Sequence, residues 1–167
     1  MMKLSNKNKR SPAQAGMGLI EIIIGSAIIL SAILAANTTY TTYTQYALAN
    51  EKNVQAAYLL EEGVEVTYFL RDKSWTANIA SLSPATAYYL NFIGGTWATT
   101  TTPVYVDGQF LRKINVALVN RDSNDDIAGA GTNDPNTRKI TVSIDYFQGH
   151  ATTTKSLSTY ITNIYNN

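Results

Sequence analysis

The chain has no cysteine among its 167 residues. Disulfide bonds and thiolate metal sites are therefore excluded. A fold without disulfides has to bury an apolar core of its own, and this chain is long enough to do so. Proline is scarce as well. None of the four prolines lies between Gly16 and Pro84, so nothing in that interval forces a helix to break.

A large surplus of positive charge is also missing, because thirteen basic residues stand against twelve acidic ones. Four of the basic residues precede Gly16 without any acid, namely Lys3, Lys7, Lys9 and Arg10. The nine that remain beyond Gly16 are outnumbered by the twelve acids. General nucleic-acid binding needs a basic patch, so this balance argues against it.

Motifs of catalysis are absent too. The single histidine, His150, follows Gly149 at an expected turn, and no Gly-x-Ser-x-Gly motif accompanies it. The glycines of Gly129-Ala-Gly131-Thr lack the lysine and the spacing of a phosphate loop. We therefore predict that the protein is not an enzyme.

The chain does contain a long apolar run behind its basic leader. The run from Leu19 to Ala36 has 18 residues, which as a helix span about 27 Å, close to the ~30 Å of membrane hydrocarbon. It holds one carboxylate, Glu21, five residues past Gly16. A carboxylate in lipid is costly unless it is paired, so Glu21 indicates a function. The leader charges predict a cytoplasmic N-terminus and an exterior C-terminal part.

This N-terminal pattern resembles the processing site of type IV prepilins and type II secretion pseudopilins. In those families a membrane peptidase cuts after the glycine and methylates the new N-terminus, and the fifth mature residue is a glutamate. The resemblance implies cleavage between Gly16 and Met17, methylation of Met17, and pairing of Glu21 with the amine of Met17 in its own or a neighbouring subunit. It also implies the partners: prepilin peptidase, other pilin or pseudopilin subunits, an inner-membrane assembly platform and membrane lipid.

A secretory signal or a plain membrane anchor is the alternative interpretation of this segment. A secretory signal has an apolar core of about 7–15 residues followed by a small-residue cleavage site. The present run is longer, and no clear site of that kind closes it. Neither alternative has a use for Glu21.

Beyond the apolar run the sequence predicts that one helix continues from about Leu19 to Asp72. Apolar residues recur at helical spacing and are expected to cover a globular head; they are Tyr43, Ala47, Val54, Ala57, Tyr58, Val64 and Tyr68. The opposite face carries Gln45, Glu51, Lys52, Gln55, Glu61, Glu62 and Glu65. Gly63 weakens the helix locally by about 1 kcal/mol. The β-prone cluster from Thr38 to Thr44 is where a kink or loosened turn is expected.

The sequence after Asp72 predicts an antiparallel β-sheet head. The fold is therefore expected to be α+β, with the helix covering the sheet. The expected strands are Ala87–Ile93, Pro103–Val106, Phe110–Val119, Arg138–Phe147 and Thr152–Tyr165. Turns are expected at Gly94-Gly95, Asp107-Gly108 and Gln148-Gly149. The threonine-rich stretch 98–102 is expected to be exposed strand or loop. The expected parts of the chain are a leader (1–16), a membrane and assembly helix (17–36), an amphipathic helix (37–72) and the head (73–167).

The loop expected from Asn120 to Asn136 is rich in oxygen ligands. Its candidate metal ligands are Asp122, Asn124, Asp126 and Asp134, because Ca²⁺ prefers hard oxygen donors. The loop is not an EF-hand by motif, since Ile127 stands where the glycine is required. The alternative is a solvated hairpin loop whose Asx side chains hydrogen-bond their own backbone. No other cofactor is expected.

Looser resemblances extend through much of the rest of the chain. The stretch from Tyr58 to Trp75, together with 121–127 and 157–163, looks like the pseudopilin I and pilin V group. The implied function is that of a minor pilin or pseudopilin, anchored by a single pass in a bacterial cytoplasmic membrane with its head outside, and then assembled into a filament at the cell surface. The alternatives are a major pilin, or a tip subunit whose head binds a surface or DNA.

Overall fold

The computed structural model describes residues 12–84, 86–149 and 151–165. Two compact units make up the chain, one ending at Leu48 and one beginning at Ala49. The long helix α1 (Pro12–Lys73) runs through the boundary between them. Each unit is described by itself below.

Helix α1 begins earlier than the sequence pattern indicates, at Pro12 rather than Leu19, and ends at Lys73, one residue beyond the expected end. Proline suits a first helical turn because its missing N–H would have no partner there. The helix is continuous through residues 38–44, so the loosened turn expected there is not formed. Thr38, Thr39 and Thr44 donate their hydroxyl hydrogen bonds to carbonyls four residues earlier, which satisfies these β-prone residues inside a helix.

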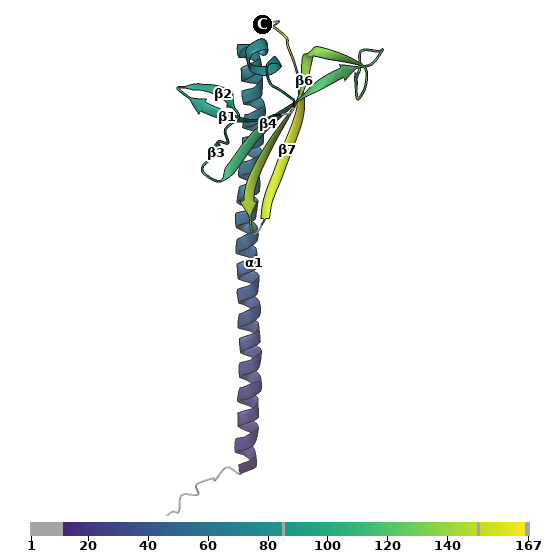
Figure 1. The fold of residues 1–167 in the computed structure, drawn as a ribbon. Helices are drawn as coiled ribbons and strands as arrows, with labels where there is room; N and C mark the ends of the chain where they lie inside the picture. Colours follow the sequence, from purple (N-terminus) through teal and green to yellow (C-terminus); the bar gives the residue numbers. More distant parts are fainter. Residues whose placement is uncertain (1–11, 85, 150, 166–167) are drawn as a thin grey trace, which may run out of the picture. The chain divides into compact units, whose positions relative to one another are not determined.

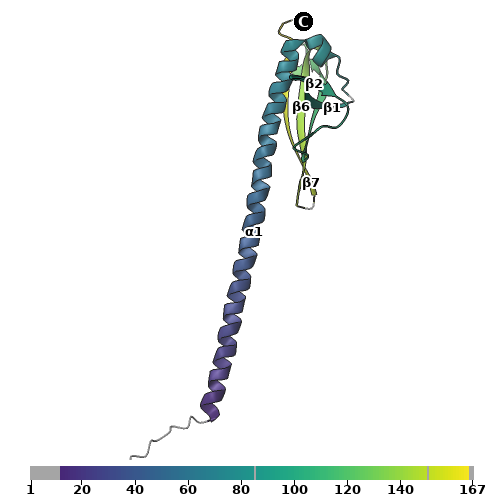
Figure 2. The ribbon, with the colours of Figure 1, turned by 90° about the vertical axis from the view of Figure 1, so that its left-hand side faces the viewer.

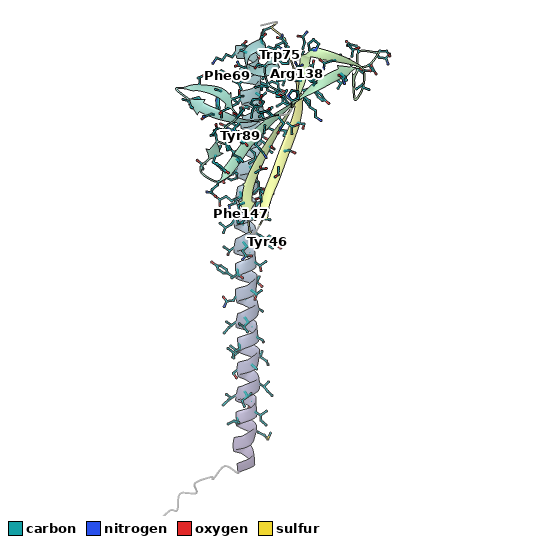
Figure 3. All side chains as sticks on the ribbon, viewed as in Figure 1. Tyr46, Phe69, Trp75, Tyr89, Arg138 and Phe147 are labelled. Carbon is teal, nitrogen blue, oxygen red and sulfur yellow. The ribbon has the colours of Figure 1, made fainter. Side chains whose placement is uncertain are left out.

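In the first unit, the part of α1 from Met17 to Leu48 has almost no burial. The segment beginning at Met17 is long and apolar enough to cross a membrane, with a mean hydropathy of 2.5 over its most apolar window and none of that window buried. Isoleucine and leucine side chains point outward on all sides of this segment, as the stick view in Figure 3 illustrates.

The second unit contains an antiparallel sheet of seven strands. The strands are β1 (Ala87–Ile93), β2 (Thr96–Thr100), β3 (Tyr105–Val106), β4 (Phe110–Arg121), β5 (Ile127–Ala128), β6 (Thr132–Gln148) and β7 (Ala151–Thr162). The main order across the sheet is β2-β1-β4-β6-β7, with β3 and β5 pairing on β4. The predicted α+β fold is confirmed.

Several strand boundaries differ from the prediction. Strand β2 is not among the five expected strands, although it overlaps the stretch 98–102 that is expected to be exposed strand or loop. A short π-helical turn, η1 (Thr76–Ala80), follows α1. Strands β4 and β6 continue past their predicted ends, and a register shift between Leu118 and Val119 marks the start of the extension. Consequently the expected loop 120–136 is largely strand, and Asp134 pairs with Val119. A turn at Gly149 closes the β6–β7 hairpin as expected.

The head-packing half of α1 lies along one face of this sheet (Figure 2). The helix residues that are buried there are Ala56, Leu60, Gly63, Val66, Thr67 and Leu70. The sheet contributes alternate residues of β4 and β6, such as Ile114 and Ile144, as expected for a sheet covered on one face. Above them, Trp75 and Ile79 close the top of the core.

The predicted packing face of the helix was wrong over residues 54–58 and right at Val64 and Tyr68. Tyr58 is 69% exposed and Val54 is 47% exposed, and Ala57 is also exposed. The small residues decide the contact instead, because a Cβ on Gly63 would lie 2.6 Å from Cγ1 of Val142. Only glycine allows the helix to approach β6 this closely. Of the periodic apolar residues that the sequence assigns to the head, Val54, Ala57 and Tyr58 are therefore exposed, whereas Val64 and Tyr68 are partly buried against the core.

Candidate functional site

The first candidate site is the start of the apolar helix. Met17 and Glu21 are four residues apart and so share one face of α1. Together with Ile20, Ile24 and Ile28 they line a shallow groove of about 520 Å³ along the helix surface. Glu21 makes no hydrogen bond or ion pair with any described residue. A carboxylate in an apolar segment is costly without a cation, and no described residue supplies one.

Gly16 lies within α1, immediately before Met17. The basic residues of the expected leader lie outside the described residues, so the structure bears on neither their conformation nor the cleavage. Cleavage after Gly16 and the role of Glu21 stay predictions. The expected boundaries at residues 16, 36 and 72 stay predictions as well.

A second candidate surface is the outward face of α1 in the second unit. Tyr58 is 69% exposed and Phe69 is 47% exposed. Large aromatic side chains that stay this exposed on one helix can mark an interaction surface. Between them lie Glu61 and Glu65, which form no ion pair among the described residues. This face therefore carries exposed apolar and acidic side chains, of which Glu65 and Phe69 border the β1–β2 hairpin.

The loop that contains the candidate calcium ligands is organised by its own hydrogen bonds. Oδ1 of Asp122 accepts hydrogen bonds from the backbone N–H of Asn124, at 2.8 Å, and from that of Asp126, at 3.1 Å. This arrangement matches the Asx alternative, in which the side chain caps its own turn. Asp125 completes the turn with a left-handed φ of 69°.

Asp134 does not belong to that turn, because it lies in β6 and its carboxylate is paired with Arg121. Its Oδ2 accepts a hydrogen bond of 2.7 Å from Nε of Arg121, and this contact lowers the pKa of Asp134 below its ordinary value. Arg121 also donates a hydrogen bond to the carbonyl of Asp125. Its guanidinium therefore supplies the positive charge beside these oxygen atoms that a bound metal ion would supply. No group of three or more acidic, histidine or cysteine side chains is placed to hold a metal in the described part of the chain. Calcium binding here stays an untested alternative. His150 lies outside the described residues.

Two buried arginines are features that sequence reasoning missed. Arg112 is 3% exposed, pairs with Glu62 of the helix, and lies 5.2 Å above the ring of Trp97. The sequence pattern places Glu62 on the solvent face, and this ion pair corrects that assignment. The burial of Arg112 could have been predicted from the sequence, because strand alternation places it on the same side of β4 as the inward residues Phe110 and Ile114.

Arg138 has a similar place at the top of the sheet. Its guanidinium lies 5.8 Å from the ring centre of Trp75, and Figure 3 shows the two side chains together. Its Nη1 donates to the carbonyls of Asp134, Pro135 and Thr137. Both arginines therefore join the sheet to aromatic side chains, and Arg112 also ties the sheet to α1.

No family model, no curated protein and no solved structure matches this chain. Its architecture supplies the comparison instead. An N-terminal apolar helix of membrane-spanning length continues into a helix that packs on an antiparallel sheet. This architecture is pilin-like.

Proposed function

We propose that this pilin-like protein is a minor pilin or pseudopilin, processed after Gly16, methylated at Met17 and assembled through its N-terminal helix into a filament. The observation that carries the proposal is the part of α1 from Met17 to Leu48, which begins with the apolar run Leu19–Ala36 and is almost wholly unburied by its own chain. Lipid covers such a surface before assembly, and neighbouring helices cover it afterwards.

The place of Glu21 supports this proposal physically. A lone carboxylate in hydrocarbon is unfavourable, and an amine freed by cleavage at Gly16 would be the nearest cation of suitable charge. Met17 and Glu21 share a helix face, so the amine of one subunit can meet the carboxylate of another as helices slide past each other. Such an ion pair between neighbouring subunits favours one axial displacement between their helices over all others.

Cleavage is tested on the mature protein in its native host. Mass spectrometry should show loss of residues 1–16 and a methyl group on Met17. Gly16→Val should leave the precursor uncut in the membrane fraction. A mature chain that begins after Ala36 would identify an ordinary signal peptide and contradict the proposal.

The role of Glu21 is tested separately by Glu21→Ala, with Glu51→Ala as the matched control. Glu51 is an exposed carboxylate on the same helix but beyond the apolar run. We expect Glu21→Ala to be processed normally and to keep a folded head, while its amount in sheared filaments falls at least tenfold. Glu51→Ala should enter filaments at close to the normal level. Normal incorporation of Glu21→Ala would refute the pairing.

A further inference from the structure

Three tyrosines follow the apolar run of α1 in the first unit. Tyr40, Tyr43 and Tyr46 are 70%, 74% and 72% exposed. Residues three apart in a helix are rotated by about 60° relative to one another, so the three side chains lie within an arc of about 120° on one side of α1. Tyrosine combines an apolar ring with a polar hydroxyl, and it is enriched where a membrane meets water.

The segment that carries these tyrosines has no charge. No Asp, Glu, Lys, Arg or His occurs from residue 22 to residue 50, although the apolar run already ends at Ala36. A helix in water normally presents charged residues on its solvent face. The uncharged stretch 37–50 instead suits the layer of intermediate polarity between hydrocarbon and water.

The threonines between the tyrosines satisfy their own hydroxyl groups. Thr38, Thr39 and Thr44 each donate a hydrogen bond of 2.9 or 3.0 Å to the carbonyl four residues earlier. A hydroxyl that is already bonded costs less to remove from water than a free one. These threonine-rich turns can therefore enter the headgroup layer without leaving those donors unpaired.

The spacing places the tyrosine rings at the height of that layer. Tyr40 lies four residues beyond Ala36, about 6 Å along the helix, and each headgroup layer is about 5–8 Å thick. Long side chains on a helix lean toward its N-terminus, so the rings of Tyr43 and Tyr46 reach back by about one turn. When the run Leu19–Ala36 fills the hydrocarbon, the three rings lie within the headgroup layer or at its outer surface.

We propose that Tyr40, Tyr43 and Tyr46 form a belt that binds the lipid headgroup layer of the exterior leaflet and fixes the depth of α1 before assembly. Lipid is the occupant because the belt is continuous with the segment of membrane-spanning length. Glu21 lies 19 residues before Tyr40, about 29 Å, which is close to the ~30 Å of hydrocarbon. The belt therefore holds Glu21 at the cytoplasmic edge of the hydrocarbon, with Gly16 about 8 Å further out. The inference rests on the proposed function and assigns the residues that position its cleavage site and its carboxylate.

Because the natural chain has no cysteine, the depth of α1 can be measured with single spin labels in the full-length protein. Ile22→Cys and Ala35→Cys place exposed labels near the two ends of the apolar run. The chain is inserted into vesicles of phosphatidylethanolamine and phosphatidylglycerol, and depth is read from the relative access of oxygen and of a water-soluble nickel complex. Both labels should lie in the hydrocarbon, near opposite surfaces of the bilayer.

Replacing all three tyrosines by alanine removes the belt and lengthens the apolar run. The helix should then move toward its N-terminal side by about 3 Å, the rise of two residues, so the label at 35 becomes deeper and the label at 22 shallower. The matched control replaces Thr38, Thr41 and Gln45 by alanine, which adds apolar surface in the same turns but on the opposite side of the helix. It should move the labels by less than the rise of one residue, about 1.5 Å. Tryptophan at all three tyrosine positions should keep the natural depths.

Unchanged depths in the triple alanine variant would overturn the inference, and so would equal shifts in this variant and its control. A triple alanine variant that keeps its depth but is missing from filaments would identify neighbouring subunits, rather than lipid, as what the tyrosines contact. Both results would leave the proposed function intact, because the depths are measured without cleavage at Gly16 and without filaments. Labels that stay outside the bilayer in the otherwise natural chain would contradict the belt and the proposed function together.

Discussion

The two parts of α1 on either side of Leu48 differ in what covers them. The N-terminal part is the more apolar, yet almost none of it is buried in its own unit. The C-terminal part is more polar, yet it contributes Leu60, Gly63 and Leu70 to the core of the head. Apolar composition alone therefore does not predict intramolecular burial. In the first part it predicts a partner outside the chain, and in the second part small residues and shape select the buried face.

The largest effect should separate the two faces of the C-terminal part. Leu60→Ala should lower the free energy of unfolding of the head by about 2–5 kcal/mol, because it leaves a cavity under the sheet. Tyr58→Ala, two residues away on the exposed face, should change it by less than about 0.5 kcal/mol. Denaturant unfolding of the purified chain in detergent, followed by tryptophan fluorescence, measures both. Equal losses in the two variants would contradict the observed helix face.

A smaller effect should separate the two parts of the helix at their glycines. In Gly63→Ala the new Cβ meets Val142 in the core, and overpacking of this kind costs about 1–3 kcal/mol. Helix propensity alone predicts the reverse, a gain of about 1 kcal/mol.

Gly25→Ala is the matched control for this prediction. Apart from its chain neighbours and the backbone of its own helical turns, no atom of the described residues lies within 4 Å of the position that a methyl group on Gly25 would take. The substitution should leave unfolding of the head unchanged. The same unfolding experiment gives both values. If Gly63→Ala instead stabilises the head, the close approach of the helix to β6 does not explain the glycine at position 63.

The smallest effect concerns the loop at Asp122, which lies far along the chain from both parts of the helix. A ligand that binds only the native state at a hundredfold excess over its Kd adds about 2.7 kcal/mol, enough to raise Tm by several degrees. We expect no such shift with millimolar Ca²⁺ against a chelator control, because Arg121 and the local N–H groups already occupy the carboxylates. A shift that Asp122→Ala or Asp126→Ala abolishes would instead establish the calcium site.

Much of the local structure follows from the sequence because its causes are local. The absence of proline between Gly16 and Pro84 permits one long helix, and its apolar N-terminal part is visible without any structure. Strand β1 has the bounds that the sequence predicts, and the alternation Ile140, Val142, Ile144 correctly predicts a strand covered on one face. These features depend on neighbours two to four residues away.

The tertiary structure alone decided which residues meet across the fold. Helical spacing indicates that an apolar face exists, but the close approach of Gly63 to Val142 and the exposure of Val54 and Tyr58 show that the buried face is shifted from the predicted one. The pairing of Glu62 with Arg112 joins residues 50 positions apart, and that of Asp134 with Arg121 depends on a register that continues past a bulge. Such contacts depend on how closely two surfaces approach in space, and that approach is settled by the packing of the whole head rather than by any stretch of its sequence.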